Sequence, residues 1–173
     1  MKRVVQIVLV LAIVGLAIWG WTAAHPSPES VVRSRLNNLA KTMSFKANSG
    51  ILSKAYNAEK ASEFFTQDIE VDINLAGFEP LAMHGRDEVV QYVMYARAHV
   101  KELKIEFLDM NVTIAPDGQT AKVNLTGKAV VPGDRDISAQ EFNFKLKKVD
   151  GKWLIYQVET VRTLSSVAAD RLT

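Results

Sequence analysis

Three histidines, His25, His84 and His99, are the residues of this sequence best suited to proton transfer or metal binding. No two of them have the close spacing that places a pair of imidazoles on one metal ion. His84 precedes a glycine and an arginine, where it could reach the mouth of a pocket or simply end a strand. Cysteine is absent, which excludes thiol nucleophiles, structural disulfides and thiolate-bound zinc. We therefore predict no metal site and no cofactor.

Other polar clusters are explained more simply by structure than by chemistry. Asp134 and Asp136 flank Arg135 and could hold a cation, but a polar hairpin tip explains the pattern better. Tyr92 and Tyr95 lie on a predicted helix, either at the edge of the core or as hydroxyl donors to a pocket. The motifs of serine hydrolases, phosphate loops, dinucleotide sites and zinc proteases are all missing. No catalytic residue is assigned from these patterns.

The charge balance excludes a nucleic-acid partner. The chain of 173 residues has a formal charge of +2, which comes from Lys2 and Arg3. Without these two, 19 of the 21 basic residues remain against 19 acidic ones, so the folded part is close to neutral. A nucleic-acid-binding domain needs a basic face. We expect one domain of ordinary globular composition.

An uncharged run from Val4 to Ala24 precedes that domain. As a helix its length would be about 31 Å, close to the hydrocarbon thickness of a bilayer. Trp19 and Trp21 near its end suit a membrane interface, and Lys2 and Arg3 favour a cytoplasmic N-terminus. We predict a membrane anchor over residues 1–24 that contacts the lipid bilayer through residues 4–24 and leaves the domain extracytoplasmic. The alternative is a signal peptide cleaved near Ala24, which would release a secreted or periplasmic domain.

Helical periodicity dominates the first half of the chain after a stiff linker over residues 25–28. Apolar residues at helical spacing predict a first helix over 28–43, with Ser27 as its N-cap. A second helical stretch is expected over 50–66 and a third from about Gly85. Between the last two, Ile69, Val71, Ile73 and Leu75 alternate with polar residues, which predicts a half-buried strand, followed by a short returning strand over 81–84.

The second half of the chain alternates with a period of two. The apolar run from Leu103 to Ile114 changes parity after Phe107, which indicates a β-bulge that bends the strand. Turns at 116–118, 132–134 and 150–151 separate the following strands, and Asp150-Gly151 is a strong hairpin signal. We therefore predict an α+β fold, in which helices pack on the concave face of a bent antiparallel sheet, preceded by one N-terminal hydrophobic helix.

This order of elements resembles the nuclear transport factor 2-like superfamily, which includes SnoaL-like and ketosteroid-isomerase-like proteins. Three segments carry the resemblance: FFTQDIEVDI, HGRDEVVQYV and VDGKWLIYQVETV. They match the family's first strand, the glycine-led start of its third helix and its last hairpin. The resemblance covers residues 29–165 and leaves 166–173 as a C-terminal tail. It implies a conical pocket between the sheet and the helices.

The resemblance also implies where catalytic groups would stand. Isomerase-like members carry a carboxylate base about five residues after an aspartate that resembles Asp68, and that position here is Ile73. The adjacent Asp72 has the parity of the outward face. A second acid would fall near Phe142, and the tyrosine expected on the first helix is absent. These residues do not support isomerase chemistry.

We expect the pocket to be lined by apolar and aromatic side chains. The candidate ligand-binding residues are Tyr56, Phe64, Ile73, Tyr95, Phe107, Phe142 and Trp153. For Trp153, which follows the last turn, a role as a lid on the core is the alternative to a role in ligand stacking. The predicted function is non-catalytic binding of a small apolar ligand or a protein partner by a membrane-anchored domain. The alternative is an exported isomerase, cyclase or dehydratase that uses the same pocket, and a homodimer through the sheet is also open.

Overall fold

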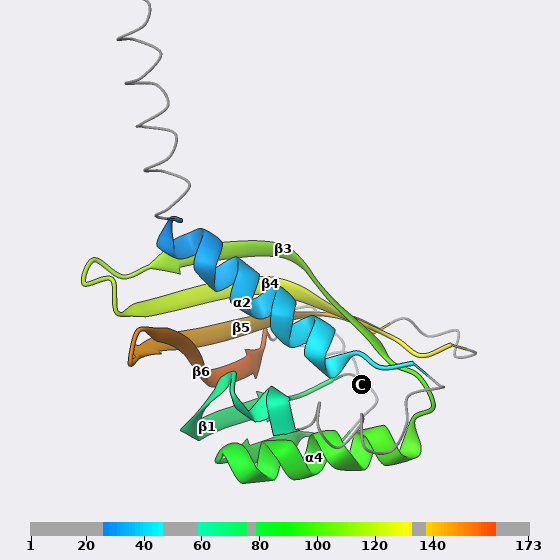
Figure 1. The fold of residues 1–173 in the computed structure, drawn as a ribbon. Helices are drawn as coiled ribbons and strands as arrows, with labels where there is room; N and C mark the ends of the chain where they lie inside the picture. Colours follow the sequence, from blue (N-terminus) through cyan, green and yellow to red (C-terminus); the bar gives the residue numbers. More distant parts are fainter. Residues whose placement is uncertain (1–25, 47–58, 76–78, 133–137, 162–173) are drawn as a thin grey trace, which may run out of the picture.

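The computed structural model describes residues 26–46, 59–75, 79–132 and 138–161. The described elements are two helices and six strands, shown in Figure 1. In chain order they are α2 (Pro28–Met43), β1 (Phe65–Ile73), β2 (Leu81–His84), α4 (Arg86–His99), β3 (Lys104–Ile114), β4 (Thr120–Val130), β5 (Ser138–Val149) and β6 (Lys152–Thr160). The strands form one sheet in the order β2-β1-β6-β5-β4-β3. The predicted α+β class is confirmed.

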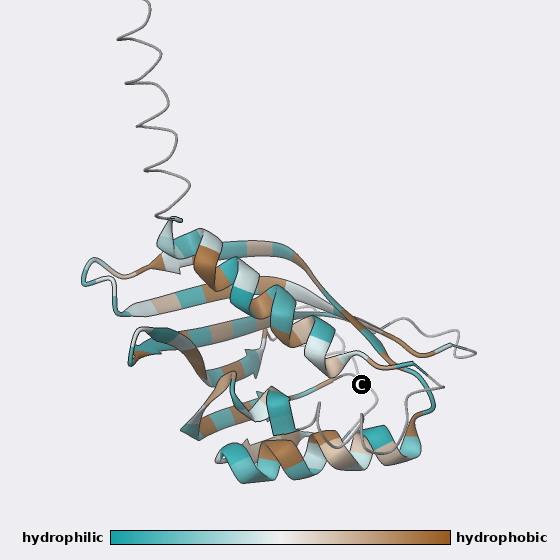
Figure 2. Cartoon of the chain, viewed as in Figure 1, coloured by the Kyte–Doolittle hydropathy of each residue, from teal (hydrophilic) through white to brown (hydrophobic). Residues whose placement is uncertain are grey.

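The first helix has the predicted bounds and the predicted cap. The Ser27 side chain accepts a hydrogen bond from the Ser30 backbone N–H at 3.3 Å, and Pro28 occupies the first turn, where a missing N–H costs nothing. Val32, Leu36 and Leu39 form the buried stripe of this helix. Figure 2 shows the same division, with brown apolar positions between teal polar ones along α2. The predicted span over residues 4–24 lies outside the described residues.

The boundary between the second helical stretch and the first strand differs from the prediction. Most of the predicted helix 50–66 lies outside the described residues, and the described part is helical only over residues 59–62. Phe65 and Thr66, which were expected in the helix, begin β1. Both are buried, because the chain enters the core at this junction. The expected parity along the rest of β1 is confirmed, with Ile69 and Val71 buried and Asp72 exposed.

The sheet is antiparallel except at one pair. β1 runs parallel to β6, and Val71 lies opposite Val158. β2 then returns antiparallel to β1, and β3 to β6 form an antiparallel meander. Sequence alternation identifies each strand, but it does not reveal that the first long strand pairs with the last. This pairing joins the two halves of the domain.

The bend of the sheet comes from a bulge that the parity change predicts. The register between β3 and β4 shifts between Leu108 and Asn111, and Asp109 has a φ of 50°. An extra residue in one strand increases its twist and bends it. Phe107 therefore faces the core, whereas Leu108 is exposed.

The last hairpin also follows its prediction. Asp150 (φ 49°) and Gly151 (φ 77°) both have the left-handed backbone conformation that a type I′ turn requires.

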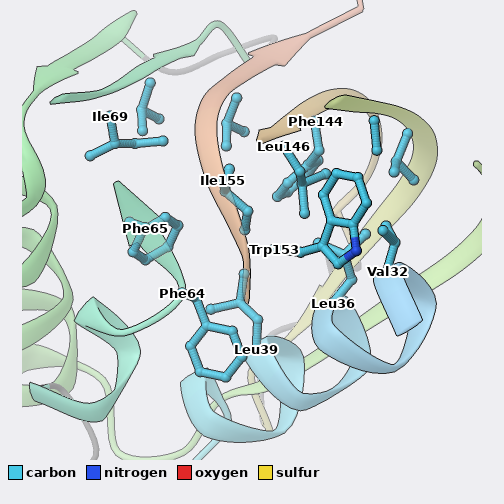
Figure 3. Close-up of a cluster of buried hydrophobic side chains, with 14 of the residues drawn as sticks. Val32, Leu36, Leu39, Phe64, Phe65, Ile69, Phe144, Leu146, Trp153 and Ile155 are labelled. Atoms are coloured by element: carbon cyan, nitrogen blue, oxygen red, sulfur yellow. The ribbon is translucent and has the colours of Figure 1, made fainter. Parts of the chain in front are cut away.

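The core lies between the sheet and α2. Figure 3 shows Trp153 beside Val32 and Leu36 of α2, with Leu146 and Ile155 of the sheet on its other side. Trp153 is only 4% exposed, and its backbone carbonyl accepts a hydrogen bond from Arg35 Nε at 3.2 Å. Trp153 therefore has the core role that was one of its two expected roles. Figure 1 shows α2 running across the sheet and α4 lying beside β1.

The opposite face of the sheet is polar. A chain of side-chain hydrogen bonds crosses three strands, from Asn124 to Asn143 to Glu159, and Lys145 bonds Gln157 at 3.0 Å. These partners hold the polar groups across neighbouring strands. A homodimer through this face stays a prediction.

Within the described ranges, no helix combines the length and apolarity that crossing a bilayer requires.

Candidate functional site

A cavity of about 280 Å³ lies between the sheet, the C-terminal end of α2 and one face of α4. Its position follows from the fold, because strand alternation directs every second side chain toward the helices and the bend opens a space beneath them. The helices contribute Leu39, Met43, Val89, Tyr92 and Val93. The two strands beside α4 and the segment after β1 contribute Phe65, Val71, Ile73, Leu75, Leu81 and Met83. The meander contributes Ile105, Phe107, Gly127, Lys128, Ala129, Gln140, Phe142, Phe144 and Val158.

Three of the predicted ligand-binding residues meet in this cavity. Ile73 reaches it from β1, Phe107 from β3 and Phe142 from β5. All three are partly buried hydrophobic residues packed against the core. Phe107 and Phe142 both lie against Phe144, with ring centroids 5.5 and 6.3 Å away in edge-to-face arrangements. The sheet side of the cavity thus includes three aromatic rings in contact.

Three of the other predicted residues, Phe64, Tyr95 and Trp153, are not part of the described lining. Phe64 is buried beneath the Arg35 guanidinium, 4.2 Å from its ring centroid. Tyr95 is 61% exposed and stacks on His99 on the outer side of α4. Trp153 fills the core at the other end of the sheet, beside α2 (Figure 3). Tyr56 lies outside the described residues. Ligand binding by all seven stays a prediction.

A glycine shapes the wall next to Phe142. Gly127 on β4 lies directly across from Gln140 on β5. A Cβ at Gly127 would lie 2.7 Å from Cε2 and 2.9 Å from Cδ2 of the Phe142 ring. Carbon atoms in contact are normally about 3.5–4.0 Å apart. The Phe142 ring therefore packs directly against the Gly127 backbone, in space that a side chain at position 127 would occupy.

The cavity has few polar groups. Tyr92 is 45% exposed at its border. Lys128 has the parity of Lys122 and Asn124, which stand on the polar face, and it pairs across the strands with Glu106. A hydrogen bond and the positive charge of Lys104 lower the pKa of Glu106, and the charge of Lys128 lowers it by a smaller amount. The Lys128 ammonium therefore acts on the polar face of the sheet, on the same side as Glu106. Among the polar residues of the described lining, Gln140 alone shares the inward strand parity of Phe142 and Phe144.

Three arginines donate hydrogen bonds to backbone carbonyls of neighbouring elements. Arg86, the first residue of α4, donates from its Nη2 to the Phe65 carbonyl at 2.6 Å. Arg33 donates to the Met110 carbonyl beside the bulge at 2.5 Å. Arg97 is buried and donates to the Thr42 carbonyl at 2.5 Å, at the end of α2. Desolvation by burial lowers the pKa of Arg97. These cations tie the elements together and do not belong to the described lining.

The described residues bring together no metal site. No group of three histidine, aspartate or glutamate side chains in that part of the chain could hold an ion. His84 is exposed, and His99 Nδ1 lies 2.8 Å from the Tyr95 carbonyl in the last turn of α4. The Asp134–Asp136 pair lies outside the described residues. The described lining contains neither a carboxylate nor an imidazole, so it presents no acid–base pair to a substrate.

Several residues that line the cavity were not among those predicted from the sequence. Leu39 and Met43 continue the buried stripe of α2, and Leu81 and Met83 alternate on the returning strand, so their periodicity was visible. Gln140 also carried a signal, because it precedes Phe142 and Phe144 at intervals of two. The sequence does not show at which point along each strand the cavity lies, because this depends on where the helices end.

Similar proteins match this architecture. The family model of the SnoaL-like domain matches residues 35–159. An NTF2-like protein of unknown function from Pseudomonas putida is 12% identical with a TM-score of 0.62, over 82% of this chain and 88% of that one. A candidate scytalone dehydratase from Novosphingobium aromaticivorans is 14% identical with a TM-score of 0.58, over 79% and 84%.

The yeast Ubp3-associated protein Bre5 is also similar, at 13% identity and a TM-score of 0.58, over 80% of this chain and all of that one. No curated protein matches the chain in sequence. At these identities the solved structures establish the fold alone. With the family match over residues 35–159, the six-stranded bent sheet and the helices beside it, the chain belongs to the SnoaL-like domain family and has the nuclear transport factor 2-like fold.

Proposed function

We propose that this domain binds a small, uncharged, apolar molecule in the cavity between the sheet and α4, without catalysing a reaction. The observation that carries the proposal is a cavity of about 280 Å³ whose lining is apolar apart from Tyr92, Lys128 and Gln140. An apolar cavity of about 150 Å³ accommodates benzene. By that standard the cavity has room for a molecule of roughly two rings.

The absence of carboxylate and imidazole groups from the described lining argues for binding over catalysis. Proton abstraction needs a group within hydrogen-bond reach of the substrate, and Ile73 stands where isomerase-like relatives carry a base. Asp72 is exposed and pairs across the strands with Ala82 and Glu159 on its two sides. The lining thus supplies little of the electrostatic stabilisation that usually dominates enzymatic rate enhancement. We further propose that residues 4–24 hold the domain at the extracytoplasmic side of a membrane.

A pair of substitutions at neighbouring positions tests the proposal. The full-length chain in lipid nanodiscs is titrated with naphthalene, and the methyl signals of Met43 and Met83 in the cavity wall report binding by NMR. Ile73→Asp places a carboxylate without a partner in the cavity and should weaken binding at least about tenfold. Asp72→Asn changes a carboxylate on the outer face and should leave binding unchanged.

Ile73→Leu controls for the loss of side-chain shape and should bind within about threefold of the original chain, since volume-conserving apolar changes are well tolerated. Urea unfolding of each variant shows that it is folded. If naphthalene does not shift the methyl signals of the original chain, the cavity does not bind apolar molecules. If Asp72→Asn abolishes turnover of a substrate found by screening, the protein is an enzyme that uses this acid.

A further inference from the structure

A groove separate from the apolar cavity runs along the first half of α2. Its volume is about 440 Å³, and it shares no lining residue with that cavity. One wall consists of Pro26 and residues of α2, and the other consists of the β5–β6 turn and Trp153. Ser30, Ser34 and Asn38 line it at intervals of four, so they stand on one side of the helix. The groove therefore presents hydroxyl and amide groups, whereas the cavity presents hydrocarbon.

The groove also carries two cations. Arg35 and Lys152 line it, and its described lining includes neither an aspartate nor a glutamate. Neither cation forms a salt bridge with an acidic residue in the described part of the chain. The acids nearest to the groove in sequence, Glu29 and Asp150, are exposed and lie outside the lining. The groove is thus positively charged, although the folded part as a whole is close to neutral, and its charge suits an anion.

Neutral groups hold the Arg35 guanidinium in place. Its Nε donates to the Trp153 carbonyl at 3.2 Å, and its Nη2 donates to the Glu63 carbonyl. Within the described ranges its Nη1 has no hydrogen-bond partner. Burial lowers the pKa of Arg35, and the Glu63 charge offsets only part of that effect. An anion in the groove would supply the missing compensation, and phosphate oxygens match the hydrogen-bonding geometry of a guanidinium.

The position of the groove in the chain favours a lipid as the source of that phosphate. If residues 4–24 span the bilayer, Pro26 follows the end of the span by two residues, which reach at most about 7 Å. The headgroup layer on each side of the hydrocarbon is about 5–8 Å thick. Figure 1 shows that the β3–β4 and β5–β6 turns lie at one end of the sheet and that α2 begins at that end. Headgroups would thus be held beside the groove at high local concentration, whereas a free anion must be captured from dilute solution.

We infer that this groove binds the phosphate of an anionic phospholipid headgroup, with Arg35 and Lys152 as the cations that recognise it. The inference rests on the membrane attachment in the proposed function, because that attachment brings the groove to the lipid. Two cations exceed the single negative charge of a phosphate. A headgroup without a cation of its own, such as phosphatidylglycerol, is therefore preferred to phosphatidylcholine, whose ammonium group cancels the phosphate charge.

The full-length chain in nanodiscs tests the inference. Phosphatidylcholine is replaced stepwise by phosphatidylglycerol, and the backbone amide signal of Gly151 in the groove is followed by NMR, with Gly118 in the other hairpin turn as the reference signal. We expect the Gly151 signal to shift and to saturate, while the Gly118 signal moves little. Lys152→Gln should raise the phosphatidylglycerol content at half-saturation about fivefold, which is the effect of one lysine at an anionic membrane surface.

Lys122→Gln is the matched control. It removes the same charge near the same end of the sheet but on its polar face, and should change the half-saturation point by less than about twofold. Ser34→Glu places a carboxylate in the groove and should abolish the Gly151 response. Asn37→Glu adds the same charge to α2 outside the groove and should keep that response. Urea unfolding shows that each variant is folded.

Three results would overturn the inference. The first is a Gly151 signal that does not respond to phosphatidylglycerol. The second is an equal effect of Lys152→Gln and Lys122→Gln, which would mean that the membrane attracts the surface charge in general. The third is an equally saturable response to inorganic phosphate in phosphatidylcholine nanodiscs, which would mean that the groove binds a free anion. Separation of the original chain from the nanodiscs during size-exclusion chromatography would instead refute the proposed attachment, and with it the basis of the inference.

Discussion

Replacing Gly127 with alanine should separate ligand binding from stability. The added Cβ would lie 2.7 Å from Phe142 Cε2, whereas a normal carbon contact is about 3.6 Å, so the ring must move by about 1 Å. Phe144 lies on one side of the ring, with the centroids 6.3 Å apart, and the cavity is the unfilled side. We therefore expect the ring to shift into the space that a ligand occupies.

The two effects of this substitution on stability nearly cancel. Alanine in place of glycine restricts the unfolded chain and stabilises the fold by about 0.4–1 kcal/mol. A side chain forced about 30° from its rotamer costs about 0.5–1.5 kcal/mol. The free energy of unfolding should therefore change by less than about 1 kcal/mol. Overpacking of a filled site costs about 1–3 kcal/mol, so naphthalene should bind about 5- to 150-fold more weakly.

The assay combines urea unfolding with the methyl titration of the full-length chain. The double variant Gly127→Ala/Phe142→Leu should recover part of the lost affinity, because the smaller side chain makes room for the new methyl group. Thr126→Ala, at the neighbouring position that faces the other side of the sheet, should change affinity by less than about twofold. Unchanged affinity in a folded Gly127→Ala variant would show that the Phe142 ring does not move into the ligand's space.

Three further predictions concern the domain and its attachment. Leu36→Ala should lower the free energy of unfolding by about 2–5 kcal/mol, because Leu36 is fully buried in the α2 stripe; Val31→Ala, at a residue 38% exposed, should cost less than about 1 kcal/mol. Equal effects of the two in urea unfolding would contradict the described packing of α2. A fragment of residues 29–165 should be soluble and unfold in one cooperative step, because the helix stripes and the sheet cover each other; aggregation would argue against a self-contained domain. The native protein should stay in membranes at full length after a carbonate wash, and a mature N-terminus at His25 would refute the anchor.

Local patterns in the sequence were sufficient to predict the strands and their inward faces. The parity change after Phe107 indicated the bulge that the structure has at Asp109, and Asp150-Gly151 indicated the tight turn. These features depend only on neighbouring residues and on backbone sterics. Ile73 was placed correctly on the inward face of β1 for the same reason.

The composition of the cavity was harder to predict, because parity tells which side of the sheet a residue occupies and not where it lies along the strand. Trp153 and Val158 have opposite parity, yet both are buried, because the register between β5 and β6 shifts between them. Trp153 lies under α2, whereas Val158 reaches the cavity. At the start of β1, the change from helix to strand directs Phe65 rather than Phe64 into the cavity. On α4, Tyr95 lies only three residues from Tyr92, yet only Tyr92 borders the cavity. These outcomes depend on tertiary packing.

The position of β6 has a consequence for how the chain is made. Of the described strands, β6 is the last to be synthesised, yet it lies between β1 and β5 in the sheet. Until it emerges from the ribosome, the β1–β2 pair and the β3–β5 meander have nothing to join them, and pairing of distant segments is the slow part of folding. The sheet can therefore close only late in translation. For a chain exported as proposed, this delay would keep the sheet from closing until β6 has been made.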